Sequence, residues 1–253
     1  MGRKPEKQMD RFGLIGKNIS YSFSKTYFKN KFQNEALLNA SYENFDIQNI
    51  QEFPKILKSN PDLKGLNVTI PYKEAIIPFL DSLNKEAQEI GAVNTIKICK
   101  NGKLKGYNTD WYGFKKTLEP VLEPHHQKAL ILGTGGASKA IAFALKKLDI
   151  AYTFVSRNSS DTHPITYTSL SESDIQNHLI VINCTPLGTH PNIDDCPKIP
   201  YQALSNKHIL YDLIYNPEQT KFLQLGKAKK ATTINGLQML IFQANKAWEI
   251  WNS

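Results

Sequence analysis

The sequence predicts an α/β fold with two domains, because short apolar strands alternate with helices along almost the whole chain. In the second half the strands are continuous apolar runs, which is typical of a parallel sheet covered on both faces. The polar stretch "EPHHQ" at 123–127 separates two such series of elements and indicates a linker. At 253 residues the chain is long enough for two modest domains.

The first series begins as a strand followed by a helix, since the apolar run "RFGLIGK" precedes a segment with apolar residues at helical spacing. The same patterns predict a strand at 11–17, a helix at 24–38, a strand at 40–47, a helix interrupted by a proline at 50–60 and a strand at 63–70. Within "LNVTIPYKEAI" (66–76), alternation predicts a half-buried strand with Asn67 and Thr69 on one face. We expect a new helix to begin near Lys73, beyond the proline.

The rest of the first series is a helix at 86–91, a hairpin and a further helix. The Asn-Gly pair at 101–102 predicts two short strands within 92–108. The helix at 109–122 starts with a favourable N-cap pair and is amphipathic up to the linker.

The second series has a strand at 128–133, a glycine-rich loop, a helix at 139–149 and further strands at 151–157, 179–186 and 208–215. This succession is Rossmann-like, which implies a doubly wound sheet. The last segment, 234–251, carries apolar residues at three- and four-residue spacing, and by itself this helix could close either domain.

The composition argues against several classes of protein. The net charge of +8 could attract a polyanion, but the lysines are spread along the chain, so a solvated basic surface is favoured over nucleic-acid binding. The three cysteines form no CxxC pair, and neither a disulfide framework nor a metal site is expected. No apolar run approaches the ~20 residues of a membrane span, and no export signal is evident, so we expect a cytoplasmic protein.

The stretch "ILGTGGAS" at 131–138 predicts a dinucleotide site, because it directly follows a strand and opens a helix. Gly133 permits the tight turn, and Gly135 lets the backbone approach a pyrophosphate at the helix N-terminus. Gly136 and Ala137 keep the start of the helix small. Taken alone, the loop could also be a structural turn between strand and helix.

The end of the next strand indicates the type of cofactor. It carries no carboxylate for a ribose 2′-hydroxyl, whereas Arg157, flanked by Ser156 and Asn158, could bind a 2′-phosphate. One such contact would favour NADP over NAD by roughly 10- to 100-fold. The alternative is a surface arginine, which is weakened because the chain otherwise uses lysine after Arg11.

Polar side chains also fall near predicted strand ends in the first half, where ligands bind in open α/β sheets. Ser24 and Asp110 could instead be N-caps, and Asn94 could be a turn residue. Asn67 and Thr69 could be the exposed face of a strand. The six positions that could converge are Ser22, Ser24, Asn67, Thr69, Asn94 and Asp110.

Eight motifs together resemble the shikimate dehydrogenase family over nearly the whole chain from about residue 11. They are "GLIGKNISYSFS", "GLNVTIPYKE", "IGAVNT", "GYNTDWYGF", "LGTGGAS", "VINCTPLG", "YDLIYNP" and "NGLQMLIFQA". The resemblance implies reversible, NADPH-dependent reduction of 3-dehydroshikimate to shikimate in aromatic amino-acid biosynthesis. It also implies a substrate-binding domain at 9–110, a Rossmann-like NADP-binding domain at 111–233, and a C-terminal helix at 234–253 that returns to the first domain.

Matched motif by motif, the resemblance implies roles for individual residues. Lys73 would be the catalytic acid or base, assisted by Asp110, and the implied substrate-binding positions are Ser22, Ser24, Asn67, Thr69, Asn94, Tyr215 and Gln243. The implied cofactor-binding positions are Gly133, Gly135, Gly136, Ala137, Ser156, Arg157, Asn158, Thr185 and Gly236. The family often has Asn-Arg-Thr where this chain has Ser156-Arg157-Asn158, so the chain departs from the family pattern at the implied 2′-phosphate site.

Two rival functions stay open at this point. An NAD-preferring enzyme that uses quinate would share most of these motifs. A non-catalytic nucleotide- or nucleic-acid-binding protein is suggested by the net charge alone. The expected partners are a small-molecule substrate, no nucleic acid and no membrane, with the chain as a monomer or homodimer.

Overall fold

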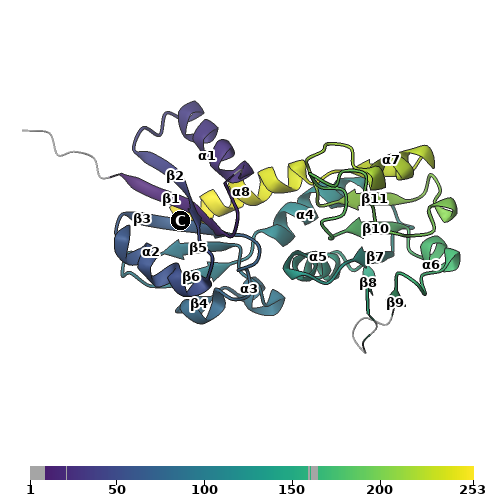
Figure 1. Ribbon diagram of the computed structural model, residues 1–253, viewed down its shortest axis with the longest axis horizontal. Coiled ribbons are helices and arrows are strands. Elements are labelled where there is room, and N and C mark those ends of the chain that lie inside the picture. The colour runs from purple at the N-terminus through teal and green to yellow at the C-terminus, as the bar shows by residue number, and fades with distance from the viewer. Residues whose placement is uncertain (1–8, 21, 159, 161–164) are drawn as a thin grey trace, which may run out of the picture. The chain divides into compact units, whose positions relative to one another are not determined.

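The computed structural model describes residues 9–20, 22–158, 160 and 165–253, and these form two compact units (Figure 1). Unit 1 comprises the chain up to Thr109 together with Ala244–Ser253, and unit 2 comprises Asp110–Gln243. The C-terminal helix α8 (Leu237–Asn252) therefore contributes residues to both units. Its first turns cluster with unit 2, because Met239 lies in a core of that unit.

Unit 1 contains a six-stranded mixed sheet in the order β2-β1-β3-β5-β6-β4. Strands β1, β2 and β3 are parallel, and β5 and β6 form the antiparallel hairpin expected from the Asn-Gly turn. The strands are β1 (Asp10–Gly16), β2 (Ala40–Asp46), β3 (Leu63–Val68), β4 (Ser82–Leu83), β5 (Thr95–Ile98) and β6 (Leu104–Tyr107).

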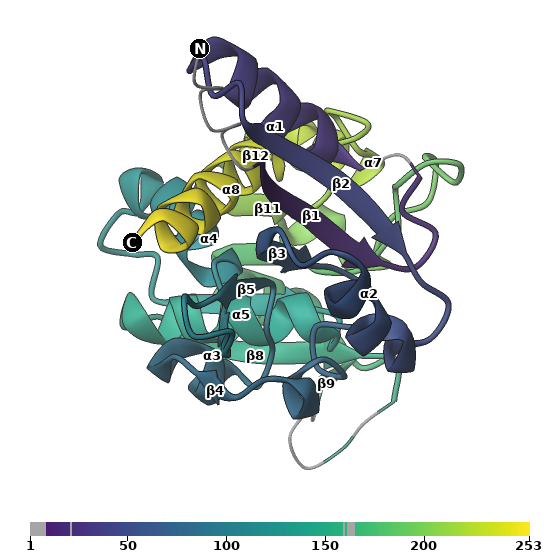
Figure 2. The ribbon, with the colours of Figure 1, turned by 90° about the vertical axis from the view of Figure 1, so that its left-hand side faces the viewer.

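Apolar clusters cover both faces of this sheet. One face packs against α2 and α3, and the other packs against α1 and the end of α8, which flank the strands in Figure 2. The helical elements of this unit are α1 (Phe23–Asn34), η1 (Ile50–Glu52), α2 (Phe53–Ser59), η2 (Ile77–Phe79) and α3 (Lys85–Ile90), of which η1 and η2 are 3₁₀ turns.

The last turn of the chain is fixed to the middle of the sheet. Trp251 lies against Gly65, where an added Cβ would sit only 2.2 Å from the indole Cδ1. The indole Nε1 donates a hydrogen bond to the carbonyl oxygen of Ile96 at 3.0 Å. A glycine in the middle of β3 is therefore required by close packing.

The segment around Lys73 differs from the prediction. β3 ends at Val68, and its last four residues are buried on both faces rather than alternating. After Val68 the chain makes turns. Between Val68 and Leu80, a segment that is described throughout, the only helical element is the 3₁₀ turn η2. The predicted helix near Lys73 is therefore wrong. A helix that began there would need an N–H of residue 78 to bond to the carbonyl oxygen of Glu74, and Pro78 has none.

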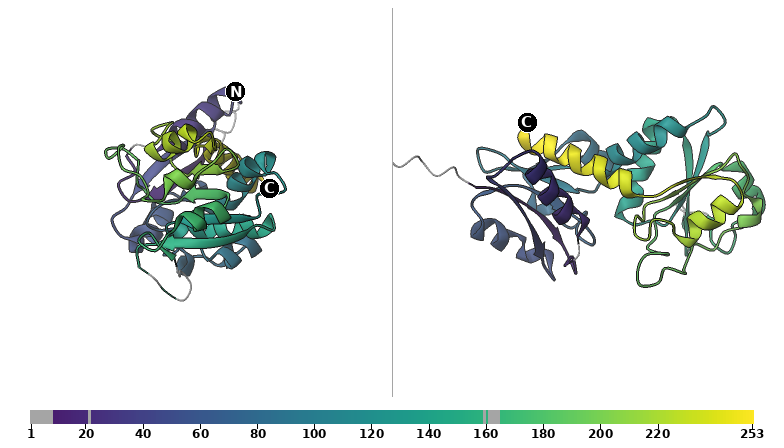
Figure 3. Two further views of the ribbon diagram at one scale, coloured as in Figure 1. Left: turned by 90° about the vertical axis from the view of Figure 1, so that its right-hand side faces the viewer. Right: turned by 90° about the horizontal axis from the view of Figure 1, so that it is seen from above.

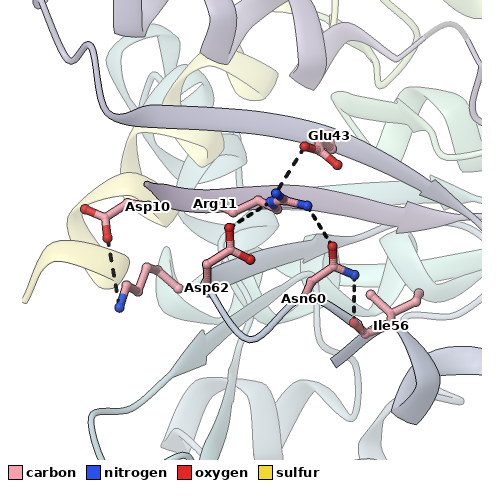
Figure 4. Close-up of polar contacts among 7 residues, drawn as sticks. Asp10, Arg11, Glu43, Ile56, Asn60 and Asp62 are labelled. Carbon is pink, nitrogen blue, oxygen red and sulfur yellow. Dashed lines mark hydrogen bonds and ion pairs between the residues drawn. The ribbon is translucent and has the colours of Figure 1, made fainter. Parts of the chain in front are cut away.

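Arg11 joins three segments near the amino ends of the strands (Figure 4). Its Nε lies 3.1 Å from Asp62 Oδ2 and 3.7 Å from Glu43 Oε1, and its Nη1 donates to Asn60 Oδ1 at 2.8 Å. The guanidinium thus forms ion pairs with two carboxylates and one hydrogen bond to a side-chain amide. This arginine therefore has a structural role at the end of the sheet opposite the strands' carboxyl ends.

Unit 2 contains a six-stranded, entirely parallel sheet in the order β12-β11-β10-β7-β8-β9. Counted from β7, this is the order 3-2-1-4-5-6 of dinucleotide-binding folds, with the topological switch between β7 and β10. The predicted Rossmann-like fold is confirmed. The strands are β7 (Lys128–Leu132), β8 (Ala151–Ser156), β9 (Ile165–Thr166), β10 (Ile180–Asn183), β11 (Ile209–Asp212) and β12 (Thr232–Ile234).

Helices cover both faces of the second sheet, which Figure 3 shows from two further directions. Along β7, Ala129 and Ile131 pack into one core with α4, α5 and the start of α8, while Leu130 and Leu132 face the other core with α6 and α7. The helical elements are α4 (Asp110–Leu118), η3 (Glu119–Val121), α5 (Gly136–Lys147), α6 (Glu172–Asn177), η4 (Tyr201–Ala203) and α7 (Lys221–Ala228).

Among the helices of the described residues, none combines the length and the hydropathy that a membrane crossing requires.

Two buried histidines, His126 and His208, are held by backbone groups of unit 2. His208 Nδ1 accepts a hydrogen bond from Ser205 N at 3.0 Å, and its Nε2 lies 3.0 Å from the carbonyl oxygen of Ile175. Burial lowers the pKa of both imidazoles below the ordinary value of 6.5, although the backbone hydrogen bonds act in the opposite direction. Both rings are therefore neutral at neutral pH.

We predict that these histidines make the protein less stable in mild acid. Below pH 6.5 the unfolded chain takes up protons that folded His208 does not, so the free energy of unfolding falls with pH until the lowered pKa is reached. The slope for one histidine is at most about 1.4 kcal/mol per pH unit. Urea denaturation of the wild type and of His208→Gln at several pH values measures this effect. The variant should show a shallower decline, and identical slopes would contradict the prediction.

Candidate active site

A network of buried polar side chains lies in unit 1 where β3 ends and the antiparallel strand β5 begins. Asn67, near the end of β3, accepts a hydrogen bond on Oδ1 from the hydroxyl of Tyr42 at 2.8 Å. Its Nδ2 donates to the carbonyl oxygen of Asn94 and to Thr95 Oγ1, both at 3.2 Å. Asn67 is only 4% exposed, so its amide is fixed by these partners and is not part of an exposed strand face.

The two serines at the start of α1 connect to the same network through β2. Ser22 is the N-cap of α1, and its hydroxyl donates to Asn44 Oδ1 at 2.9 Å. Ser24 hydrogen-bonds the hydroxyl of Tyr42, whose pKa is raised by burial. Tyr42 and Asn44 lie two residues apart on β2 and thus share one face of the strand. Ser22, and not Ser24, therefore fills the capping role considered from the sequence.

Asn94 links this network to Thr109, which also belongs to unit 1. Its Oδ1 accepts from Thr109 N at 2.7 Å and from Thr95 Oγ1 at 3.0 Å, and its Nδ2 donates to Thr109 Oγ1 at 3.0 Å. Thr109 directly precedes Asp110, which is 6% exposed and is the first residue of α4. The side chain of Asn94 thus fixes the backbone from which Asp110 projects.

Lys73 and Thr69 lie in the turns that follow β3. Thr69 N donates to the carbonyl oxygen of Ile15 at 2.9 Å, and the carbonyl oxygen of Lys73 accepts from Val93 N at 2.7 Å. Between them, the buried Tyr72 donates through its hydroxyl to the carbonyl oxygen of Ile47 at 2.8 Å. The backbone on both sides of Lys73 is therefore anchored, while its side chain is half-buried.

The glycine-rich loop of unit 2 has the backbone that the sequence predicts. Gly133 adopts φ +99°, and an added Cβ would lie 3.0 Å from Thr185 Cγ2. Gly135 is the N-cap of α5. An added Cβ would have no atom within 4 Å, so the space beside the first helical turn is open and a side chain here would fill it. Gly136 and Ala137 begin α5, and their small size keeps the amide groups of this turn accessible to an anion. These features fit a pyrophosphate.

The polar residues after β8 lie on the surface. Arg157 and Asn158 are exposed, and the hydroxyl of Ser156 donates to the carbonyl oxygen of Asn158. Ser156 therefore shapes the turn that presents Arg157. Because β8 and β10 flank β7, Arg157 lies on one side of the glycine-rich loop and Thr185, beyond β10, lies on the other. A dinucleotide that spans the topological switch needs this layout.

The remaining predicted residues also belong to unit 2. Tyr215 is half-buried, and burial raises the pKa of its hydroxyl. Gln243 is 7% exposed, and its Nε2 donates to the carbonyl oxygen of Leu240 at 3.1 Å. At Gly236 an added Cβ would lie 2.1 Å from the carbonyl oxygen of Leu213, so close backbone approach requires glycine there.

Within the described residues, no cluster of three or more His, Cys, Asp or Glu side chains could hold a metal ion.

Sequence reasoning missed Tyr42 and Asn44. The signal that could have found them is the alternation in "SYENFD", which puts both side chains on one face of a strand. It gives no indication, however, that this face meets the start of α1 and the end of β3.

Comparisons with known proteins show to which family the chain is related. The model of the shikimate dehydrogenase substrate binding domain matches residues 14–96. A protein of Desulforamulus reducens named Shikimate dehydrogenase (NADP(+)) is 37% identical, with 94% of this chain and 88% of that protein covered.

Solved structures show the same relationship. The shikimate dehydrogenase of Aquifex aeolicus has a TM-score of 0.86 at 36% identity, covering 98% of this chain and 94% of its own. The Thermus thermophilus enzyme, solved with NADP(H) and shikimate, has a TM-score of 0.85 at 31% identity, covering 96% of this chain and 93% of its own. Because the likeness to these relatives extends over nearly the full length at 31–37% identity, this chain belongs to the shikimate dehydrogenase family.

Proposed function

We propose that the protein is an NADP-dependent shikimate dehydrogenase that reversibly reduces 3-dehydroshikimate to shikimate, a step of aromatic amino-acid biosynthesis. The observation that carries the proposal is the set of hydrogen-bonded side chains formed by the half-buried Ser22 and Ser24 and the buried Asn67 and Asn94, in a chain that also has the dinucleotide-binding strand order. These side chains are far apart in the sequence, and the fold of unit 1 brings them to one end of its sheet.

The chemistry of the network suits a hydroxylated ring acid. Serine hydroxyls can donate to a carboxylate, and asparagine amides can both donate to and accept from ring hydroxyls. In the structure the proton of Ser22 points to Asn44, so substrate binding would turn it towards the carboxylate. Asn67 and Asn94 are already held by neighbouring groups, which reduces the entropy that substrate binding would cost.

The cofactor would be held by three parts of unit 2. The first turn of α5 offers N–H groups and a partial positive charge to the pyrophosphate. Arg157 suits a 2′-phosphate, because a guanidinium forms charge-assisted hydrogen bonds with phosphate oxygens. The loop with Thr185 would lie at the nicotinamide end. When bound, NADPH supplies the hydride, and the protein supplies binding and orientation.

Lys73 would move the proton of the reaction. Reducing a ring ketone builds negative charge on its oxygen, and an ammonium group can stabilise that charge and donate the proton. In the reverse direction the amine accepts the proton of the substrate hydroxyl. Asp110 would assist by hydrogen-bonding the same hydroxyl, and the hydrogen bonds of Asn94 would fix the backbone of Thr109, which directly precedes it.

We predict that Lys73→Ala lowers kcat by at least about 100-fold, since a positioned acid or base contributes roughly 10²–10⁴-fold. NADPH binding and the fold should be preserved, because the contact of this residue with Val93 uses its backbone carbonyl. Lys55→Ala, an exposed position of α2 in the same unit, is the matched control. Steady-state kinetics and NADPH titration measure both effects, and an unchanged kcat would refute the role of Lys73.

We also predict that Arg157→Ala lowers the preference for NADPH over NADH, expressed as the ratio of kcat/KM values, by about 10- to 100-fold. The loss arises because NADH has no 2′-phosphate for the guanidinium to bind. Lys128→Ala removes an exposed charge at the amino end of β7 and should leave the ratio unchanged. A ratio that does not respond to Arg157→Ala would remove this residue from the cofactor site.

The overall proposal is tested by following the absorbance of NADPH in the presence of shikimate and NADP, with parallel reactions containing quinate and NAD. The fastest turnover should occur with shikimate and NADP. An NAD-preferring quinate enzyme would give the opposite pattern, and a non-catalytic protein would give no turnover in any combination.

A further inference from the structure

Asp212 is a completely buried carboxylate at the end of β11. Its Oδ2 accepts from Thr220 Oγ1 at 2.6 Å, and its Oδ1 accepts from Ile214 N and from Asn183 Nδ2, both at 3.0 Å. Asn183 ends the adjacent strand β10 and is the register partner of Asp212. A charged group in this position needs such partners, because burying an unpaired carboxylate is very costly.

Asn183 uses its remaining polar groups on the loop that follows it, residues 184–188. Its Oδ1 accepts from Thr185 N at 3.0 Å and from Thr185 Oγ1 at 2.6 Å, while its Nδ2 also lies 3.3 Å from the carbonyl oxygen of Leu187. The loop is therefore folded around one buried amide. It lies against the glycine-rich loop, since Thr185 Cγ2 would be 3.0 Å from a Cβ at Gly133.

The carboxylate determines which way the amide of Asn183 points. An ionised carboxylate only accepts hydrogen bonds, so Asp212 must receive the NH₂ end of Asn183. The oxygen of the same amide is then turned towards Thr185, where two donors need an acceptor. A neutral amide at position 212 would accept and donate equally well, and this constraint on Asn183 would be lost.

The charge state of Asp212 agrees with this geometry. Burial raises the pKa of its carboxyl group to about 6, and the hydrogen bonds from Thr220, Ile214 and Asn183 oppose that shift. The titratable groups that interact with it are Cys184 and Tyr201, and burial raises the pKa of both, so they are neutral at neutral pH. The carboxylate form therefore prevails above about pH 6.

We propose that Asp212 is a positioning residue that acts through Asn183 to hold the 184–188 loop in the shape that receives the nicotinamide end of the cofactor. The inference rests on the proposed function. With the pyrophosphate at α5 and the 2′-phosphate at Arg157 beyond β8, the other half of the dinucleotide extends over β10, where this loop begins. Hydride transfer depends steeply on that geometry, since a misplacement of about 1 Å can cost about 100-fold in rate.

The experiment compares Asp212→Asn and Asn183→Ala with a matched control, Asp174→Asn. Asp174 also accepts from a hydroxyl and a backbone N–H, those of Ser171, but it does so in the cap of α6. Three quantities are measured: kcat with shikimate and NADP, the fluorescence of the nicotinamide in bound NADPH, and the dissociation constant of adenosine 2′,5′-bisphosphate, which lacks the nicotinamide half.

Both test variants should lose about 10- to 100-fold in kcat and show bound-NADPH fluorescence close to that of free NADPH. Binding of the bisphosphate should change by less than about twofold, because its contacts lie on the β8 side of the sheet. The control should keep all three values. If Asp212→Asn does not fold, Asn183→Ala carries the test, since it leaves Asp212 with its bonds to Ile214 and Thr220.

Unchanged kcat and fluorescence in a folded test variant would overturn the proposal. Loss of bisphosphate binding in proportion to kcat would also overturn it, because the residue would then support unit 2 as a whole. A wild type that binds NADPH with altered fluorescence but does not oxidise shikimate would refute the proposed function alone. Loss of that fluorescence in the variants would still support positioning by Asp212.

Discussion

The structure depends on satisfying polar groups where the parallel strands end. At these ends the chain leaves the sheet, and buried amides and hydroxyls must find partners within the protein. In each unit one buried asparagine meets this need: Asn94 binds both the backbone and the side chain of Thr109, and Asn183 binds both the backbone and the side chain of Thr185. Each asparagine thereby fixes the loop or helix start that follows.

The same constraint gives the protein its chemistry. A buried amide that loses one partner leaves unsatisfied groups, at a cost of about 1–3 kcal/mol, so each network strongly favours a single arrangement. In unit 1 that arrangement gathers Ser22, Ser24 and Asn67 and fixes Thr109. In unit 2 it holds the 184–188 loop against the glycine-rich turn. The groups proposed to bind substrate and cofactor are thus held in position before either ligand binds.

Much of the fold is predictable from the sequence, because long apolar runs and glycine-rich turns report local structure directly. Periodicity predicts the central strands and the dinucleotide loop, whereas β4 and β9, with two residues each, are too short to give a pattern. The strand order and the network are not predictable in this way, because both depend on which segments pair in space. One signal was available, however: Asp212 stands in the apolar run "ILYDLIY", and a charge inside a buried strand implies a partner on a neighbouring strand.

The most direct test is a crystal structure of the protein with shikimate bound. The carboxylate of shikimate should contact Ser22 and Ser24, and its ring hydroxyls should contact Asn67 and Asn94. The hydrogen bonds of Tyr42 to Asn67 and of Asn94 to Thr109 should be the same as in the structure described above. Shikimate bound elsewhere, or amides of Asn67 and Asn94 that turn over to receive it, would contradict a site that is formed before the substrate arrives.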